Sequence, residues 1–259
     1  MTINKDASVI TTVAATATAM IGVISLSGFT ITTGGELKGS PAGSEGLTTS
    51  RPGAVVIDFN DAPDLDFTTV GTVNQKGATY TPDETLVINN GGALVPTTGA
   101  VPFSGLTQNN TSAYLSLPTN SQDNVGTNQV SIQLPKPSNY WGMHWGSMDA
   151  SNQIEFFRGD TSLARFTPDD FVSLGVGPGA GSDNQTEAAN NPYMNFSAEG
   201  SQQWFDQVVL TQRGDDETLA FESDNHAYDS VPEPLTILGS GLALGFGAIF
   251  KKQQSRRRQ

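Results

Sequence analysis

Short runs of hydrophobic residues recur through the middle of the chain, and each is bounded by Gly, Asn, Pro or Asp. Val130, Ile132 and Leu134 alternate with polar residues, and this period of two is typical of a half-buried strand. No long window of this region holds the period of 3.6 residues that indicates an amphipathic helix. The pattern predicts strands at residues 55–59, 85–88, 113–117, 130–134, 141–145, 154–157, 163–166, 193–196, 205–211 and 219–228.

Many short strands separated by turn residues favour an all-β fold. We expect an antiparallel two-sheet sandwich, jelly-roll-like, over residues 54–230. No internal repeat is evident, which disfavours a propeller or a β-helix. One short helical turn is expected at Pro168, with Thr167 as its N-cap.

The C-terminal end of the chain differs from the body in charge and hydropathy. Residues 235–250 are uncharged, follow Val231, Pro232, Glu233 and Pro234, and precede five cations, Lys251, Lys252, Arg256, Arg257 and Arg258. Of the 13 Lys and Arg, these five leave eight cations against 26 Asp and Glu elsewhere, a net charge of −18. The apolar stretch is shorter than the roughly 20 residues of a full span. The basic stop-transfer end predicts a single short transmembrane helix whose tail stays in the cytoplasm while the body is exported.

This three-part end resembles the PEP-CTERM sorting signal, with its motif at 231–234, its helix at 235–250 and its basic tail at 251–259. The resemblance implies an exosortase as a partner. It implies anchoring in the membrane through the helix before processing near the motif. It also implies delivery to the cell surface or extracellular matrix of a Gram-negative-type bacterium that makes exopolysaccharide.

The N-terminal end should then carry an export signal. Residues 1–27 contain Lys5 followed by an uncharged stretch, which predicts a secretory signal peptide without a defined cleavage site. The alternative is a disordered or strand-forming N-terminus. Residues 28–53 are rich in Gly, Ser, Thr and Pro and are interpreted as a flexible linker.

Three segments of the body carry a second resemblance. Residues 140–157 (YWGMHWGSMDASNQIEFF), 205–210 (FDQVVL) and 221–228 (FESDNHAY) are similar to one family of exosortase-dependent surface proteins, best known in cyanobacteria. The resemblance spans about residues 54–234. The family has no established enzymatic activity, so it implies no catalytic residues here.

Composition excludes several kinds of site. The chain has no Cys and two His, which excludes disulfides and thiolate metal sites and leaves little for a histidine cluster. A net charge of −13 argues against nucleic acid as a partner, because binding to phosphate needs a basic surface. Nucleophile-elbow, zinc-protease and phosphate-loop motifs are absent.

Acidic residues cluster in the first and last predicted strands of the sandwich, which often meet in such folds. The candidate calcium ligands are Asp58, Asp61, Glu222 and Asp224. Carboxylate oxygens suit Ca²⁺, so a structural calcium ion is the one cofactor expected; solvated acidic loops are the alternative. Two carboxylates also suffice for glycoside hydrolysis, although nothing in the sequence singles out an acid and a base.

The tryptophans offer a second candidate site. In a strand, Trp141 and Trp145 share one face with Met143, and that face is either core or a flat platform on which sugar rings stack. Asp149 and Asn152 could then hydrogen-bond sugar hydroxyls.

Taken together with the sorting signal, these features lead us to expect an exported, non-enzymatic surface or matrix protein that is a structural or weakly glycan-binding component of the exopolysaccharide layer. The alternative is a secreted polysaccharide hydrolase.

Overall fold

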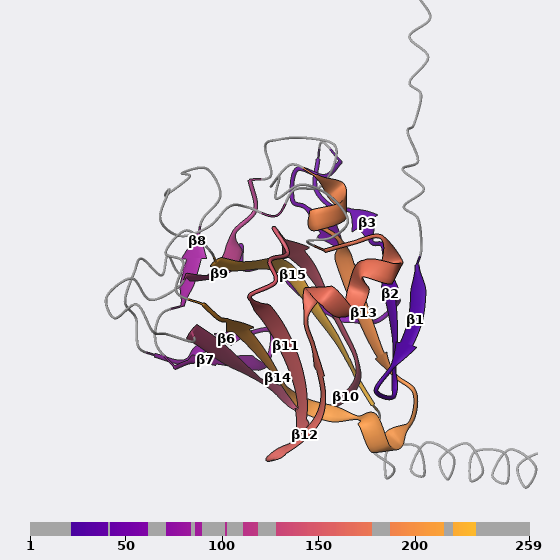
Figure 1. Cartoon of the computed structure of the whole chain (residues 1–259). Helices are drawn as coiled ribbons and strands as arrows, with labels where there is room; N and C mark the ends of the chain where they lie inside the picture. The colour runs from indigo at the N-terminus through magenta and orange to yellow at the C-terminus, as the bar shows by residue number, and fades with distance from the viewer. Residues whose placement is uncertain are drawn as a thin grey trace, which may run out of the picture.

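The chain folds into β-strands joined by loops and short 3-10 helices (Figure 1). The computed structural model describes residues 22–40, 42–61, 71–83, 86–89, 102, 111–118, 128–177, 187–214 and 220–231. The strands are β1 (Val23–Leu26), β2 (Phe29–Thr33), β3 (Glu36–Leu37), β4 (Leu47–Thr48), β5 (Val55–Ile57), β6 (Val73–Gln75), β7 (Ala78–Pro82), β8 (Val87–Asn89), β9 (Tyr114–Pro118), β10 (Asn128–Gly146), β11 (Asn152–Arg158), β12 (Thr161–Phe166), β13 (Tyr193–Ala198), β14 (Phe205–Gln212) and β15 (Ala220–Ser230). The 3-10 helices are η1 (Pro168–Leu174), η2 (Ala188–Asn190) and η3 (Ser201–Gln203).

Thirteen of these strands form one curled antiparallel sheet. Its main path runs β1-β2-β13-β10-β14-β11-β12, while β15 pairs with β10, β5 and β9. Strands β3 and β4 form a separate ribbon. The all-β, antiparallel prediction is confirmed. The two separate sheets that we expected are instead continuous through β10, and the jelly-roll connectivity stays a prediction.

Strand β10 joins the two parts of the sheet. Its residues 130–133 pair with β14 and β7, whereas residues 140–144 pair with β13 and, over most of that stretch, with β15. The register against β14 shifts between Gln133 and Ser138, where Pro135 and Pro137 have no N–H to donate. These prolines explain why the pattern predicts two strands, 130–134 and 141–145, where the structure has one.

Each predicted strand overlaps an observed one, but within residues 54–230 the pattern misses β6 and β7, whose residues include Asn, Gln, Thr and Pro. The predicted helical turn is confirmed by η1. Its Thr167 backbone N–H donates to Asp170 Oδ2 at 2.8 Å. The gaps in the strand prediction therefore lie where strands are short and polar.

The interpretation of residues 28–53 as a linker is wrong, because β2, β3 and β4 lie there. Phe29 and Ile31 are fully buried in the core, and β2 pairs with both β1 and β13. Strand β1 overlaps the end of the predicted signal peptide, as the strand-forming alternative requires, while residues 1–21 lie outside the described residues. Thr occurs in loops but also has high β-propensity, so the Thr-rich composition conceals the alternation of β2.

Aromatic side chains fill the core enclosed by the curled sheet. The Phe156 ring lies 4.8 Å from the rings of Phe29 and Phe205, measured between centroids. Trp145 stacks on Phe221 at 4.8 Å. Such pairs contribute about 0.5–1.5 kcal/mol each beyond their buried area. The aromatic core therefore contains side chains from β2, near one edge of the sheet, and from β15, which has strands paired on both sides.

Candidate ligand-binding pocket

The structure places the predicted tryptophan platform inside the core. Trp141 and Trp145 have 0% exposure. The Trp145 indole N–H donates to Asn152 Oδ1 at 3.0 Å, and the Asp149 backbone N–H donates to the same oxygen at 3.1 Å. Asn152 is itself fully buried. The predicted glycan contact through Trp141, Trp145, Asp149 and Asn152 is therefore wrong: the tryptophan face is core, and Asn152 holds the turn between β10 and β11.

Both faces of this part of β10 are covered, which a period-two pattern does not reveal. A Cβ at Gly142, on the face opposite the tryptophans, would lie 2.5 Å from Tyr140 Oη and 2.7 Å from Tyr193 Oη. His144 is buried on that face, and its Nδ1 accepts the Leu47 backbone N–H at 3.2 Å. The β3–β4 ribbon thus covers the face of β10 opposite the tryptophans, which would be exposed to solvent if only one face of the strand were covered.

The predicted calcium ligands Asp58 and Asp61 follow β5, Glu222 and Asp224 lie on β15, and these two strands do pair. The four side chains do not converge on one point. Asp58 Oδ2 lies 2.6 Å from Lys38 Nζ, whereas Asp61 Oδ2 lies 3.2 Å from Lys76 Nζ. Across the described ranges, no group of three or more His, Cys, Asp or Glu side chains could hold a metal ion. The structure therefore does not bring Asp58, Asp61, Glu222 and Asp224 together as a metal-binding group.

A lysine lies where the cation was expected. Lys38 Nζ contacts Asp58 Oδ2, Glu45 Oε2 at 3.2 Å and Asn225 Oδ1 at 3.2 Å. Next to it, the fully buried Asp224 accepts a hydrogen bond from Ser112 Oγ and one from the Asn225 backbone N–H at 2.5 Å. We call this group the Lys38 cluster; its members are Lys38, Glu45, Asp58, Asp224 and Asn225.

The two aspartates of the Lys38 cluster are in opposite protonation states. Burial raises the pKa of Asp224 to about 8, and the hydrogen bond from Ser112 only partly opposes this. Burial also acts to raise the pKa of Asp58, but the hydrogen bond and charge of Lys38 outweigh it, so the net pKa is lowered. At neutral pH the cluster therefore holds one neutral acid and one carboxylate beside an ammonium.

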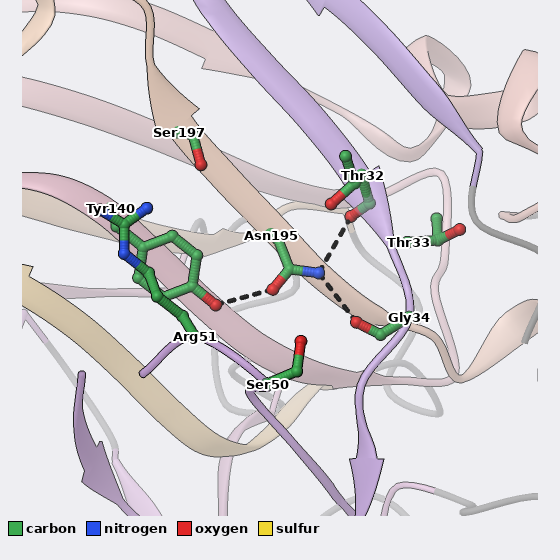
Figure 2. A pocket seen from close by; sticks show the side chains of 8 residues that line it. All are labelled: Thr32, Thr33, Gly34, Ser50, Arg51, Tyr140, Asn195 and Ser197. Carbon is green, nitrogen blue, oxygen red and sulfur yellow. Dashed lines mark hydrogen bonds between the residues drawn. The ribbon is translucent and has the colours of Figure 1, made fainter. Parts of the chain in front are cut away.

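An open polar pocket of about 240 Å³ lies where β2, β10 and β13 meet the segment after β4 (Figure 2). Its lining residues are Thr32, Thr33, Gly34, Ser50, Arg51, Tyr140, Asn195 and Ser197. They present hydroxyls, an amide, a phenol and a guanidinium, with no carboxylate among them. Groups of this kind hydrogen-bond neutral polar ligands.

Asn195 forms the floor of the pocket (Figure 2). Its Oδ1 accepts the Tyr140 hydroxyl at 2.7 Å, and its Nδ2 donates to the carbonyls of Gly34 at 2.9 Å and Thr32 at 3.4 Å. Because β13 lies between β2 and β10, this one side chain bridges all three strands. The floor is therefore formed before any ligand arrives.

Arg51 forms one wall, and its charge is already compensated. Its guanidinium carbon lies 4.6 Å above the Tyr140 ring, its Nε donates to Asp229 Oδ2 at 2.9 Å and its Nη2 donates to Asn139 Oδ1 at 3.0 Å. Burial raises the pKa of Tyr140 although the hydrogen bond with Thr49 opposes it, so the phenol is neutral. The pocket thus has little net charge.

Three hydroxyls of the pocket remain available. In the described part of the chain, the side chains of Thr32, Ser50 and Ser197 make no hydrogen bond. A hydroxyl both donates and accepts, as the hydroxyls of a sugar do. The free groups around the fixed floor therefore match a polyhydroxylated ligand.

This pocket is missed by the sequence analysis. Thr32, Ser50 and Arg51 fall within the predicted linker, and Arg51 contacts Asn139, 88 residues further along. The alternation of residues 29–33 is the one local signal that could have placed Thr32 on a strand. The remaining contacts depend on strand pairing between distant segments.

The described residues end where the predicted sorting motif begins. β15 ends at Ser230, and the Val231 N–H donates to the Pro137 carbonyl at 3.0 Å. Pro232, Glu233 and Pro234, the predicted helix at 235–250 and the basic tail at 251–259 lie outside the described residues. Among the residues that are described, no helix is long and apolar enough to span a membrane.

Comparisons with known proteins add little to this geometry. No protein-family model matches the chain, and no curated protein matches it. A solved structure of the catalytic domain of a GH87 α-1,3-glucanase variant in complex with tetrasaccharides is similar at 15% identity and a TM-score of 0.26. The similarity covers 63% of this chain and 30% of that chain. No conclusion about fold, activity or ligand follows from a similarity of this size.

Proposed function

We propose that this chain is an exported, non-enzymatic protein of the cell surface or extracellular matrix that is sorted by an exosortase and contacts polysaccharide through the pocket around Asn195. The order of the C-terminal end carries the sorting proposal: a Val-Pro-Glu-Pro motif, an uncharged stretch and five cations. The fold is compatible with this order, because β15 is complete at Ser230, directly before the motif.

The pocket supports binding in preference to hydrolysis. Glycoside hydrolysis requires two carboxyl groups on either side of the scissile bond, and no carboxylate lines this pocket. Elsewhere, Asp58 and Asp224 have opposite protonation states, but Asp224 is fully buried and Asp58 is paired with Lys38. The secreted-hydrolase alternative is therefore the less well supported of the two.

The ligand class follows from charge. Asp229 compensates Arg51, and the chain outside its basic tail is strongly acidic, so an anionic polysaccharide would be repelled. A neutral polysaccharide meets the free hydroxyls of Thr32, Ser50 and Ser197 without a charge penalty. No aromatic ring face is open in the pocket, since Tyr140 is buried, so we expect weak binding.

Fractionation tests the sorting proposal: the protein is expected at the cell surface or in the medium, shortened near residue 231. Unprocessed chain dissolved in the cytosol would contradict it.

Retention on a neutral glucan and on alginate tests the pocket. We expect retention on the glucan that added salt does not weaken, and loss of retention in the double variant Ser50→Ala/Ser197→Ala. Ser173→Ala, an exposed serine on η1, is the matched control and is expected to bind as wild type.

A further inference from the structure

A lysine amine and an asparagine side-chain amide lie within hydrogen-bonding distance in the Lys38 cluster. Lys38 Nζ is 3.2 Å from Asn225 Oδ1 and 2.6 Å from Asp58 Oδ2. The Asn225 Nδ2 is 3.2 Å from Asp224 Oδ2. Around this one amide, Lys38 is thus placed as the nucleophile and Asp58 as the proton acceptor. The Asn225 side-chain amide is the electrophile, and Asp224 is the proton donor.

We propose that Lys38 and Asn225 form a covalent isopeptide bond, in which Lys38 Nζ attacks Asn225 Cγ and ammonia is released. The bond would join the β3–β4 ribbon to β15 within the folded chain. It would give this cysteine-free protein a cross-link that does not depend on redox conditions.

Asp58 prepares the nucleophile. An ammonium has no free electron pair, so Lys38 must first transfer a proton, and the Asp58 carboxylate at 2.6 Å is placed to accept it. The charges of this pair favour the ionic form, so the free amine is a minor species and the reaction is slow. Slow reaction is sufficient for a bond that forms once in the life of the protein.

Asp224 assists the leaving group. It is fully buried and neutral at neutral pH, and its Oδ2 faces Asn225 Nδ2, the nitrogen that must leave. The Lys38 electron pair forms the Nζ–Cγ bond, and the electron pair of the Cγ–Nδ2 bond departs with Nδ2. Asp224 gives a proton to Nδ2 and takes the second proton lost by Nζ.

The proton held by Asp58 then passes to the released ammonia. One Lys ammonium and one carboxamide become one secondary amide and one ammonium ion, and both aspartates return to their starting states. The step needs no oxidant, cofactor or other reactant.

The amide is held in one orientation. Asn225 Nδ2 donates to the Glu45 backbone carbonyl at 2.7 Å, and the Tyr193 hydroxyl donates to the backbone carbonyl of Asn225 at 3.0 Å, which holds the main chain at this residue. Asn225 also has a φ of 47°, in the left-handed region that few non-glycine residues adopt. This backbone turns the side chain toward Lys38 and fixes it there.

Asn225 is a better electrophile than Asp58, although Asp58 is closer to Lys38. Asp58 is ionised, and a negatively charged carboxylate resists attack by an electron pair. The Asn225 carbonyl is uncharged and fully buried, which also protects the product from water. The product would close a loop of 187 residues between Lys38 and Asn225, and cross-links of this kind stabilise by restricting the unfolded chain.

Mass spectrometry of the folded full chain after digestion tests the proposal. We expect one linked pair of peptides, containing Lys38 and Asn225, lighter than the sum of the two by the mass of one ammonia. The link should be absent in Lys38→Arg and absent or much reduced in Asp224→Ala. Lys76→Ala, which removes an exposed lysine paired with Asp61, is the matched control and should retain it.

Three results would overturn the proposal, and the first depends on no variant folding. Recovery of the Lys38 and Asn225 peptides unlinked from folded wild-type protein excludes the bond. Loss of ammonia that persists in Lys38→Arg indicates cyclisation at Asn225 alone. A link with loss of water identifies Asp58 as the acceptor in place of Asn225.

Discussion

His226 should make the folded state sensitive to acid. It is fully buried on β15, where Nδ1 is 2.9 Å from Tyr80 Oη and Nε2 is 2.9 Å from Ser223 Oγ. The rings of Phe59 and Trp141 also enclose it, at 5.1 and 5.0 Å. Burial lowers the pKa of His226 from 6.5 to about 3, because desolvation penalises the charged imidazole.

The sign of the effect follows from linkage. Below pH 6.5 the unfolded chain binds a proton at this histidine, whereas the folded chain does not until about pH 3. The stability that His226 contributes is thus fully present above pH 6.5 and is lost as the pH falls. The slope is about 1.4 kcal/mol per pH unit, so on the order of 3 kcal/mol is lost between pH 6 and pH 4.

Urea unfolding of wild type and His226→Gln at several pH values between 7 and 4 measures this. The variant is expected to be less stable at pH 7, because Tyr80 and Ser223 lose a hydrogen-bond partner. As the pH falls below 6.5, the free energy of unfolding of wild type minus that of the variant should decrease by about 1.4 kcal/mol per pH unit. Tyr80→Phe keeps the histidine and should keep the wild-type slope. Parallel pH profiles for wild type and His226→Gln would refute the reasoning.

Wild type must be compared with His226→Gln because Asp224 changes the free energy of unfolding with pH in the opposite direction. Its pKa of about 8 in the folded chain exceeds the 3.8 of the unfolded chain. Stability from Asp224 is therefore complete below pH 3.8 and is lost as the pH rises toward 8. Between pH 6.5 and 3.8 the contributions of His226 and Asp224 have similar slopes of opposite sign, so they nearly cancel in wild type, and only the difference between wild type and variant isolates His226.

Three further predictions follow from the corrected positions of the candidate residues. Trp145→Ala should destabilise the fold by about 3–5 kcal/mol in urea unfolding, because a core side chain is lost. Unchanged stability with reduced retention on glucan would instead support the tryptophan face as a glycan-binding surface. Ile31→Ala should cost about 2–5 kcal/mol by the same assay, whereas a residue in a flexible linker would cost nothing measurable. Addition of Ca²⁺ or of a chelator should leave the melting temperature unchanged, because the described carboxylates are not gathered into a group that could hold a metal ion; a rise with Ca²⁺ would contradict this.

The positions of most strands could be predicted from the sequence, because strand formation depends on local pattern. In β10, Val130, Ile132 and Leu134 are buried whereas Ser131 and Gln133 between them are not, as a half-buried strand requires. What covers a strand cannot be read in the same way. Trp141 and Trp145 fit a core strand and a binding face equally well, and the side chains that pack on them, His226 and Phe221, are distant in sequence.

The candidate site was less predictable than the fold for the same reason. Asn195 acquires its role from pairing of β13 with β2 and β10, and Arg51 from a contact with β15. The Lys38 cluster likewise joins residues near both ends of the described chain. The acidic residues were recognisable as a group, but the lysine that compensates them lay in the segment interpreted as a linker.

The position of β15 connects the proposed anchor to these sites. If the chain is held at the surface through the residues after Val231, as proposed, force enters the fold at the C-terminal end of this strand. Force along β15 loads its hydrogen bonds to β10, β5 and β9 together, because these bonds run across the strand direction. Residues 220–228 are all buried, so displacing the strand also exposes the core. A bond from Asn225 to Lys38 would stop that displacement a few residues inside the anchor, and the proposed cross-link and anchor therefore act on the same strand.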